Sequence, residues 1–566
     1  MMKLEQLAEL HILYPEYKDL SVETLLSGID KETLFKVSTY LIGKDLFANQ
    51  NTSVEDLVSV WFSEGNLVFA SNFVNRVSTY QILNKKDLVI LHNISILKIL
   101  DYAIANQAEI RVSKSKEQSE IDLLFCLLLL NQTEDFHQTK DINKIKELFS
   151  NTYAAALLFN YQFATGDITN FEIIDYVPCQ LIKSFYLFQF LETTNEGKEL
   201  LSRFYNYFQI NCYREYFERA LPIIFAWINR DVPSSVDLVL ENNGHYIENY
   251  NFLKKFALNS TNSIEGLDFK HLREKPLIQL NDTTFRIIHP LFIADKIYKG
   301  NYFLLNFLNS QQQKIVADFM SWFTTHFSEN YLFKQLINYC FPKTDICLFD
   351  NDYLNKGIQA APDCYIKMDN DVLLFENKDI LINGNIKASY NFESTINEIK
   401  KKLLLKKEKP VGIGQLVTHI KTLLNGNKDF DSSFSNVNTI FPIIVTHYDM
   451  FDTPGLNILL NDSFKTELDK LKASGFYVTN VKPLVIVNID TLICISDGLN
   501  EGYLSFVPLL KSYCDLVYKT NMELNVFTNP KDVFVPFSIF AKNLVAKTNG
   551  EHWSSEKLFR MLFSRI

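Results

Sequence analysis

The sequence is poor in the residues that mark zinc sites, disulfide scaffolds and disordered chains. Its 566 residues include eight cysteines, 18 glycines and 15 prolines. The cysteines are scattered and form no C-x-x-C pair, which excludes the usual zinc-site spacings and is typical of reduced thiols in a cytosolic protein. No Walker-type phosphate loop, G-x-S-x-G elbow or dinucleotide-binding fingerprint is present. Any ATP-driven movement on nucleic acid is therefore expected to need another protein.

A hydrophobic run long enough to cross a membrane is also lacking. The longest run, from Ile121 to Leu130, is interrupted by Asp122 and is about half of the ~20 residues that a spanning helix needs. Residues 1–20 contain early acidic side chains and no apolar h-region, which is not the pattern of a signal peptide. We therefore expect a soluble, cytoplasmic protein with no membrane partner.

The sequence also has fewer basic than acidic residues. The net charge is −10 at pH 7, which argues against a protein that coats nucleic acid nonspecifically, because such proteins carry broad basic faces. A local basic groove stays compatible with this balance. The one dense basic run covers residues 400–409, and it either contacts phosphates or forms a solvated helix face.

What the sequence has in abundance is apolar and aromatic side chains. They make up 47% of the chain and include 46 phenylalanines and 27 tyrosines, enough for a large folded core. The length predicts roughly two to four packed units. Residues 1–265 have mostly helical spacing, with leucines at 4, 7, 10 and 13 one turn apart and a capping-type serine at 21. This region is predicted to be a helical domain of unknown role, with further helices at 54–61, 94–104, 141–148 and 212–228.

The spacing of apolar residues changes after this region. Residues 266–309 are predicted to be a connector that contains a hairpin, with strands near 276–280 and 285–288. A long helix from about Ser310 to Tyr339 follows, and then the order strand, strand, strand, helix, strand. Residues 498–566 are predicted to be a helical extension packed on this core. The predicted strands cover 346–349, 363–368, 372–378, 441–446 and 483–495, and the helix covers 411–424.

The segment from Ala361 to Lys378 contains the candidate catalytic residues. An Asp-Asn-Asp turn at 369–371 separates two strand-like runs and predicts a hairpin. Folding about that turn places Asp363 opposite the end of the second strand. Glu376 and Lys378 are two residues apart on that strand, so both project from one face. Two carboxylates and an ammonium are therefore expected to converge.

Such a trio suits the hydrolysis of phosphodiesters. Carboxylate oxygens bind Mg²⁺ or Mn²⁺ and leave positions for water and a phosphate. The metal lowers the pKa of a bound water, and a neighbouring lysine orients or deprotonates that water and stabilises the developing charge. The plain alternative is a charged hairpin end on the surface.

The motif resembles that of the PD-(D/E)xK nuclease superfamily. Pro362-Asp363, twelve intervening residues and then Glu376-Asn-Lys378 fit its pattern. The resemblance implies a restriction-endonuclease-like α/β core at 310–497, a mixed central sheet flanked by helices. It also implies catalytic roles for Asp363, Glu376 and Lys378, with both carboxylates as metal ligands. Glu329 is the only glutamate on the preceding helix, and it is the candidate for a further ligand.

A second match lies downstream. Gln415-Leu-Val-Thr-His419 resembles the glutamine-x-x-x-tyrosine motif of the RecB/Cas4-like branch, with His419 in place of tyrosine. The resemblance implies that Gln415 belongs to the site. The plain alternative is an ordinary amphipathic helix, since residues four apart share a helix face in either case.

The expected function is a Mg²⁺- or Mn²⁺-dependent nuclease, with DNA favoured over RNA as the substrate. A nuclease joined to an unfamiliar helical region suggests bacterial defence against phage or plasmid DNA, by analogy of architecture. The helical region is expected to bind a protein partner, restrain the nuclease or sense a signal. Two alternatives stay open. One is a fold that binds nucleic acid or protein without cutting, and the other is an RNase.

Overall fold

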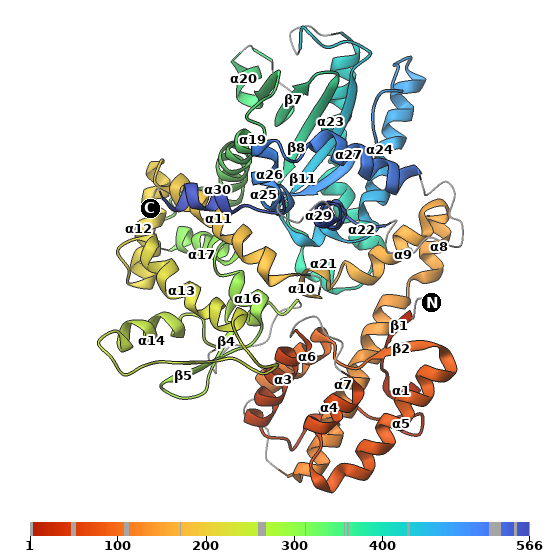
Figure 1. The fold of residues 1–566 in the computed structure, drawn as a ribbon, viewed down its shortest axis with the longest axis vertical. Helices are drawn as coiled ribbons and strands as arrows, with labels where there is room; N and C mark the ends of the chain where they lie inside the picture. Colours follow the sequence, from red (N-terminus) through yellow and green to blue (C-terminus); the bar gives the residue numbers. More distant parts are fainter. Residues whose placement is uncertain are drawn as a thin grey trace. The chain divides into compact units, whose positions relative to one another are not determined.

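The protein is mostly helical and contains a mixed five-stranded sheet in the middle of the chain (Figure 1). It divides into two compact units, each built from two separated segments of the chain: unit 1 is residues 1–140 and 208–296, and unit 2 is residues 141–207 and 297–566. The sequence-based division at 265, 309 and 497 runs consecutively and places 141–207 with the N-terminal helices. The computed structural model describes residues 4–46, 53–106, 113–169, 171–258, 268–311, 313–355, 357–358, 361–426, 431–519, 534–547 and 552–564.

Unit 1 is predominantly helical, as its apolar spacing predicts. Ser21 caps α2 (Val22–Leu26), because its side chain accepts a hydrogen bond from the backbone N of Thr24 at 3.1 Å. The prediction of a helix from the first leucine is wrong at its start. Residues Leu4–Leu7 form strand β1, which pairs in parallel with β2 (Lys86–Val89), and only Leu10–Leu13 are helical as α1. A four-residue segment is too short for spacing to fix its period, and a distant strand partner decides it.

The main helices of unit 1 are α3 (Lys31–Asp45), α4 (Val54–Trp61), α5 (Leu67–Asn84), α6 (Asn93–Ala105), α7 (Lys116–Thr139) and α13 (Tyr213–Ile228).

The hairpin predicted in the connector is confirmed. Strands β4 (Leu277–Gln279) and β5 (Thr284–Ile287) pair antiparallel. A third strand, β3 (Asp237–Val239), pairs antiparallel with the other edge of β5, which gives the order β3-β5-β4. The third strand was not predicted, because it is only three residues long and two of its side chains are exposed, so it has no apolar alternation to detect.

The central sheet belongs to unit 2 and has the order β12-β11-β8-β7-β6. The β6–β7 and β7–β8 pairs are antiparallel, whereas β11 runs parallel to both β8 and β12. The strands are β6 (Ile346–Phe349), β7 (Cys364–Met368), β8 (Asp371–Lys378), β11 (Thr439–Thr446) and β12 (Val485–Asn488). Each of them lies within or beside a predicted strand.

The last predicted strand is too long. Residues 483–495 were predicted to be extended throughout, but the strand ends at Asn488 and α25 (Ile489–Cys494) begins. The side chain of Asn488 accepts a hydrogen bond from the backbone N of Asp490 at 2.9 Å and caps this helix. An apolar, β-branched run does not distinguish a buried strand from a buried helix, so the pattern alone missed the change.

Strand β8 contributes side chains to a hydrophobic core on each face of the sheet. Val372 and Leu374 pack with α22 (Phe392–Leu403), α23 (Ile413–Leu424) and α24 (Leu456–Ala473). Phe375 points the other way, and its ring centroid lies 6.0 Å from that of Phe333 and 6.4 Å from that of Phe506. Figure 1 shows α19 (Lys334–Cys340) on one side of the sheet and α23 with α24 on the other.

The helix predicted from about Ser310 to Tyr339 starts later than expected. Helix α17 (Lys299–Ser310) ends where the predicted helix begins. Residues 319–340 are helical without a break, as α18 (Phe319–Trp322), the π-helical η3 (Phe323–Phe333) and α19. Asp318 sets the start, since its side chain accepts a hydrogen bond from the backbone N of Ser321 at 3.1 Å.

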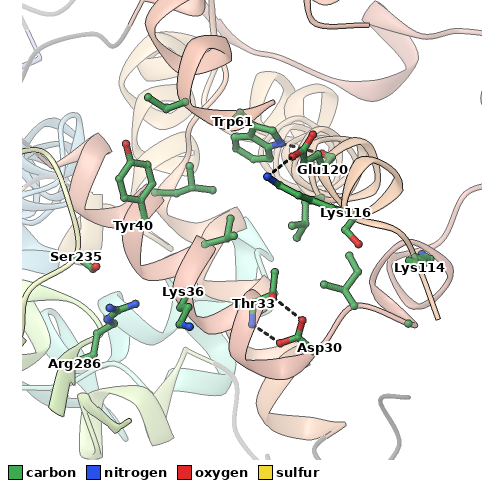
Figure 2. A pocket seen from close by; sticks show the side chains of 17 residues that line it. Asp30, Thr33, Lys36, Tyr40, Trp61, Lys114, Lys116, Glu120, Ser235 and Arg286 are labelled. Atoms are coloured by element: carbon green, nitrogen blue, oxygen red, sulfur yellow. Dashed lines mark hydrogen bonds and ion pairs between the residues drawn. The ribbon is translucent and has the colours of Figure 1, made fainter. Parts of the chain in front are cut away.

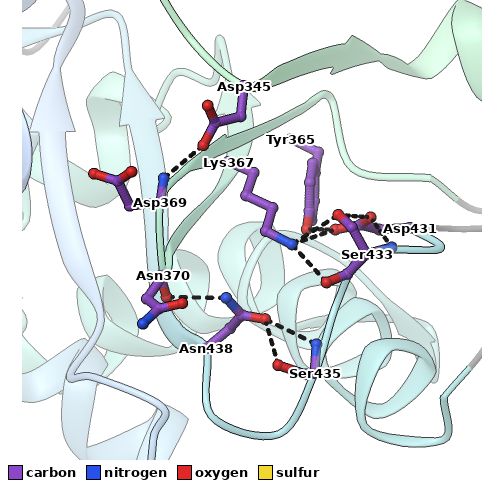
Figure 3. A network of polar contacts seen from close by, with 9 residues as sticks. All are labelled: Asp345, Tyr365, Lys367, Asp369, Asn370, Asp431, Ser433, Ser435 and Asn438. Carbon is purple, nitrogen blue, oxygen red and sulfur yellow. Dashed lines mark hydrogen bonds and ion pairs between the residues drawn. The ribbon is translucent and has the colours of Figure 1, made fainter.

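Buried polar contacts hold the far end of the β7–β8 hairpin, away from the candidate site (Figure 3). The ammonium of Lys367 donates to the backbone O and the Oγ of Ser433, each at 2.7 Å. The hydroxyl of Tyr365, on the same strand, donates to the carboxylate of Asp431. These contacts tie the loop before β11 to the hairpin and so fix the strands that carry the candidate site.

Two further segments complete unit 2. Residues 141–207 are helical, with α8 (Ile142–Leu148), α9 (Tyr153–Gln162), α10 (Gly166–Thr169), α11 (Ile173–Leu191) and α12 (Asn195–Phe208). The described part of the C-terminal extension is largely helical, with α26 (Ser496–Glu501), α27 (Phe506–Cys514), α29 (Phe537–Lys547) and α30 (Glu556–Phe563). Within the described ranges, no helix is long and apolar enough to cross a membrane.

Candidate functional site

The register of the hairpin brings the predicted trio together. Cys364 pairs with Phe375, so Asp363, one residue earlier, lies opposite Glu376. The Nζ of Lys378 lies 3.3 Å from Asp363 Oδ2 and 2.7 Å from Glu376 Oε2. One ammonium therefore contacts both carboxylates, as the turn and the strand alternation predict.

The trio is recessed rather than spread over a surface. The exposed fraction of the side chain is 0% for Glu376, 10% for Asp363 and 16% for Lys378. The backbone N of Asn377 also donates to Asp363 Oδ2, at 2.6 Å. These values exclude the interpretation of a charged hairpin end on the surface, because charged groups are buried in this way only when they are paired.

Burial and charge act together on these groups. Burial, reinforced by the charge of Glu376, raises the pKa of the Asp363 carboxyl to about 6. Burial acts in the same direction on Glu376, but Lys378 and then His419 outweigh it, and the pKa of Glu376 is lowered. For Lys378, burial is outweighed by Asp363 and Glu376, and the pKa of the ammonium is raised. The trio thus contains an ion pair between Glu376 and Lys378, and beside it the carboxyl of Asp363, whose ionised form is disfavoured.

Glu329, the candidate further ligand, is electrostatically linked to the same site. It lies on η3, and burial, followed by the charge of Asp363, raises the pKa of its carboxyl to about 8, while Lys378 opposes the shift. Its π-helical segment also contacts the residue directly after β8, because the hydroxyl of Ser328 donates to the carboxylate of Asp379. The predicted upstream carboxylate is therefore on the element that packs beside the site.

Gln415 does not contact the trio. Its Oε1 accepts a hydrogen bond from the backbone N of Gly412 at 2.8 Å and caps the first turn of α23. His419, one turn later, reaches the site instead. Its Nε2 lies 2.9 Å from Glu376 Oε1, and because an ionised carboxylate only accepts hydrogen bonds, the Nε2–H is the donor. The motif thus places a residue at the site, but through its histidine.

A second histidine, His447, was not anticipated. It follows the end of β11, and its Nε2 donates to Asn377 Oδ1 at 2.8 Å. Burial lowers the pKa of this imidazole, which favours the neutral form. Asn377 lies between Glu376 and Lys378 and projects to the opposite face of β8. His447 therefore supports the strand from behind, through a contact over 70 residues that no local pattern indicates.

The donor set fits a divalent cation by charge. Asp363, Glu376 and Glu329 carry three carboxyl groups against the single ammonium of Lys378, and two of these carboxyls have a raised pKa. A divalent cation would supply the missing positive charge, and carboxylate oxygens are the ligands that Mg²⁺ and Mn²⁺ prefer. In the part of the chain that the structure describes, no three His, Cys, Asp or Glu side chains are already grouped as a metal site.

Comparison with known proteins gives no relative: no protein-family model, curated protein or solved structure matches the chain. A function for this chain therefore rests on the geometry and chemistry of its own residues.

Proposed function

We propose that the region 310–497 is a restriction-endonuclease-like nuclease that uses Mg²⁺ or Mn²⁺ to hydrolyse phosphodiester bonds. The observation that carries the proposal is the contact of one ammonium, Lys378, with both Asp363 and Glu376 at the end of a β-hairpin. This hairpin lies in a mixed sheet with helices on both faces. The residues, their order along the chain and their convergence agree with the resemblance to the PD-(D/E)xK superfamily.

Asp363 and Glu376 would hold the ion, with Glu329 as a further or water-mediated ligand. When bound, the ion supplies a water of lowered pKa and offsets the charge that develops on the phosphate. Lys378 holds the attacking water by a hydrogen bond from its ammonium, and it stabilises negative charge on the phosphoryl oxygens. His419 holds Glu376 in one orientation, since it donates to the oxygen that Lys378 does not contact.

We favour DNA over RNA as the substrate, and a bacterial defence role against phage or plasmid DNA. Support for both comes from the resemblance and from the joining of a nuclease-like core to an unfamiliar helical unit. The same metal chemistry cuts either nucleic acid, so the substrate is an outcome of the experiment.

The test is cleavage of labelled double-stranded DNA, single-stranded DNA and RNA with Mg²⁺, Mn²⁺ or EDTA. Wild type is compared with Lys378→Ala and with a matched control, Lys511→Ala. Lys511 is 46% exposed and pairs with Asp371 at 2.9 Å, at the other end of β8. Metal-dependent cleavage that Lys378→Ala abolishes and Lys511→Ala retains supports the proposal. Cleavage that survives Lys378→Ala contradicts it.

The second candidate function is binding of nucleic acid without cleavage. The closed contact of Lys378 with both carboxylates favours this candidate, because an ammonium can replace a metal ion as the partner of a carboxylate pair. The two functions differ in their response to metal. A bound ion stabilises the folded state by linkage, so Mg²⁺ should raise the melting temperature of the wild type but not of Asp363→Asn. No shift together with retained DNA binding supports the second candidate.

A further inference from the structure

Unit 1 contains a pocket of about 670 Å³, and all of its lining residues belong to unit 1, so it shares no residue with the carboxylate site. It is formed by α3, by the end of α4 and by the start of α7, with Ser235 and Arg286 at one side. Small-molecule sites in proteins span about 300–1,000 Å³. The pocket is therefore of a size to enclose a small ligand, and Figure 2 shows its lining side chains.

Two aromatic side chains line the pocket, Tyr40 from α3 and Trp61 from α4. Both are partly exposed. The Nε1 of Trp61 donates to the backbone O of Glu120 at 2.9 Å, which fixes the orientation of the indole ring. Val37 and Leu123 add apolar surface. The indole ring is therefore already held in place, so a planar ring system can stack on it without an entropic cost for ordering the indole. Stacking on an aromatic side chain is possible for every nucleobase.

The carboxylates of the pocket are already satisfied by hydrogen-bond donors. Asp30 accepts from the backbone N of Thr33 at 2.8 Å and from its hydroxyl at 2.6 Å. Glu120 Oε2 accepts from Ser63 N at 2.9 Å and from Asn66 Nδ2 at 2.7 Å. Asp30 caps the start of α3, and Glu120 links residues 63–66 to α7, so both carboxylates are poorly placed to bind a cation from solution.

Two of the basic side chains that line the pocket are also already paired with groups of the protein. Arg286 forms a two-pronged contact with Asp237, at 2.6 and 2.8 Å, and Lys114 donates to the backbone O of Thr24 at 2.9 Å and lies 2.6 Å from Asp122. They therefore stiffen the wall of the pocket.

Lys36 and Lys116 remain available. Their side chains are 54% and 75% exposed, and each is paired with a carboxylate one turn away on its own helix, Glu32 and Glu120. The second of these pairs is 4.0 Å long. Exposed pairs of this kind are weak and exchange readily. The charged groups of the pocket that can most easily change partner are therefore these two ammonium groups, and they line the same pocket as the aromatic side chains.

We propose that this pocket binds a free nucleoside phosphate, with the base against Tyr40 and Trp61 and the phosphates held by Lys36 and Lys116. Lysine ammonium groups are common phosphate ligands, and charge-assisted hydrogen bonds to phosphate are the strong ones. An apolar ligand would leave both lysines unused, and an inorganic anion would leave the aromatic surface unused. This proposal does not depend on the proposed nuclease activity.

The test is isothermal titration of the full chain with ADP, GDP, CDP and UDP, in EDTA so that no metal ion bridges a nucleotide to the carboxylate site. Adenosine and tripolyphosphate report the two halves of the ligand separately. The variants are Lys36→Gln with Lys116→Gln, Tyr40→Leu, and the matched control Lys18→Gln, an exposed lysine of unit 1 outside the pocket. Lys378→Ala is included as a variant of the other site.

At least one diphosphate should bind. The double lysine variant should weaken it by about tenfold or more, the value of one lost charge-assisted contact, while Lys18→Gln and Lys378→Ala leave it unchanged. The lysine variants lie on the surface and keep the fold, so they decide the question even if Tyr40→Leu destabilises unit 1. Absence of binding by all four diphosphates overturns the proposal. So does binding of adenosine or of tripolyphosphate as tight as that of the best diphosphate, or binding that the double variant does not weaken.

Discussion

His419 and Glu376 meet across the sheet and helix interface, with 2.9 Å between Nε2 and Oε1. The pair joins α23 to β8, and both side chains are buried. The other oxygen of Glu376 contacts Lys378 at 2.7 Å. The carboxylate is thus held from two sides, which fixes its orientation at the proposed metal site.

His419→Ala should therefore reduce metal-dependent cleavage. Loss of a residue that orients a metal ligand costs about 10- to 100-fold in activity or metal affinity. His419→Tyr, which restores the residue of the resembling motif and a hydroxyl donor, should recover part of the loss. The measurement is kcat/KM at saturating and at limiting Mg²⁺, with Thr418→Ala, an exposed neighbour, as the control. Equal activity of His419→Ala and wild type at limiting Mg²⁺ would contradict this role.

Lys378 should also matter for stability in the absence of metal. Without its ammonium, Asp363 and Glu376 face each other as buried carboxylates, and an uncompensated buried charge costs about 3–5 kcal/mol. Lys378→Met should therefore lower the free energy of unfolding in EDTA, and adding Asp363→Asn should restore a part. Urea denaturation measures both effects. Additive losses in the double variant would show that the ammonium does not act through Asp363.

The local part of the site could be predicted from sequence, whereas its supports could not. The 369–371 turn and the two-residue alternation of a strand are enough to bring Asp363, Glu376 and Lys378 together, because the whole arrangement spans a single hairpin. His419 and His447 reach it over 43 and 70 residues. Their contacts depend on how α23 and β11 pack, and no short-range spacing contains that information.

The division of the chain shows the same limit. Residues 141–207 have ordinary helical spacing, and nothing in their composition separates them from the helices before them. They belong to unit 2 because of specific tertiary contacts. Among these is the ion pair of Lys387 Nζ with Asp167 Oδ1, at 2.6 Å across 220 residues. Spacing identifies helices, but tertiary contacts decide which unit they join.

This ion pair supplies a test of that packing. The side chains of Lys387 and Asp167 are 1% and 4% exposed, so Lys387→Met should lower the free energy of unfolding by about 3–5 kcal/mol, because the buried carboxylate of Asp167 loses the ammonium that it is paired with. Adding Asp167→Leu should recover most of this loss. The control is Lys144→Met, which removes a half-exposed pair between the same segment and α22, with Glu393, and should cost much less than the loss of the buried pair, because solvent screens it. Equal effects of the two lysine substitutions in urea denaturation would mean that the buried pair does not hold the segment.

His289 should make unit 1 less stable in acid. Burial, with a smaller contribution from Arg273, lowers the pKa of its imidazole to about 3 from an ordinary value of 6.5. Its Nδ1 accepts a hydrogen bond from the backbone N of Leu291 at 3.2 Å and caps α16 (Pro290–Ala294), which requires that nitrogen to be unprotonated. As the pH falls from 6.5 toward 3, the unfolded chain takes up a proton that the folded chain refuses. The stabilisation is thus complete above pH 6.5 and is lost progressively below it.

The variant His289→Asn keeps a capping side chain but cannot titrate in this range. Relative to this variant, the wild type should lose about 1 kcal/mol per pH unit between pH 6 and pH 4, since one pKa unit corresponds to about 1.4 kcal/mol. Other titrating groups are common to both proteins, so the difference isolates His289. The measurement is urea denaturation at pH 7, 6, 5 and 4. A difference between the two proteins that does not change with pH would mean that the imidazole takes up its proton equally in the folded and the unfolded chain, and that its Nδ1 is not needed to cap α16.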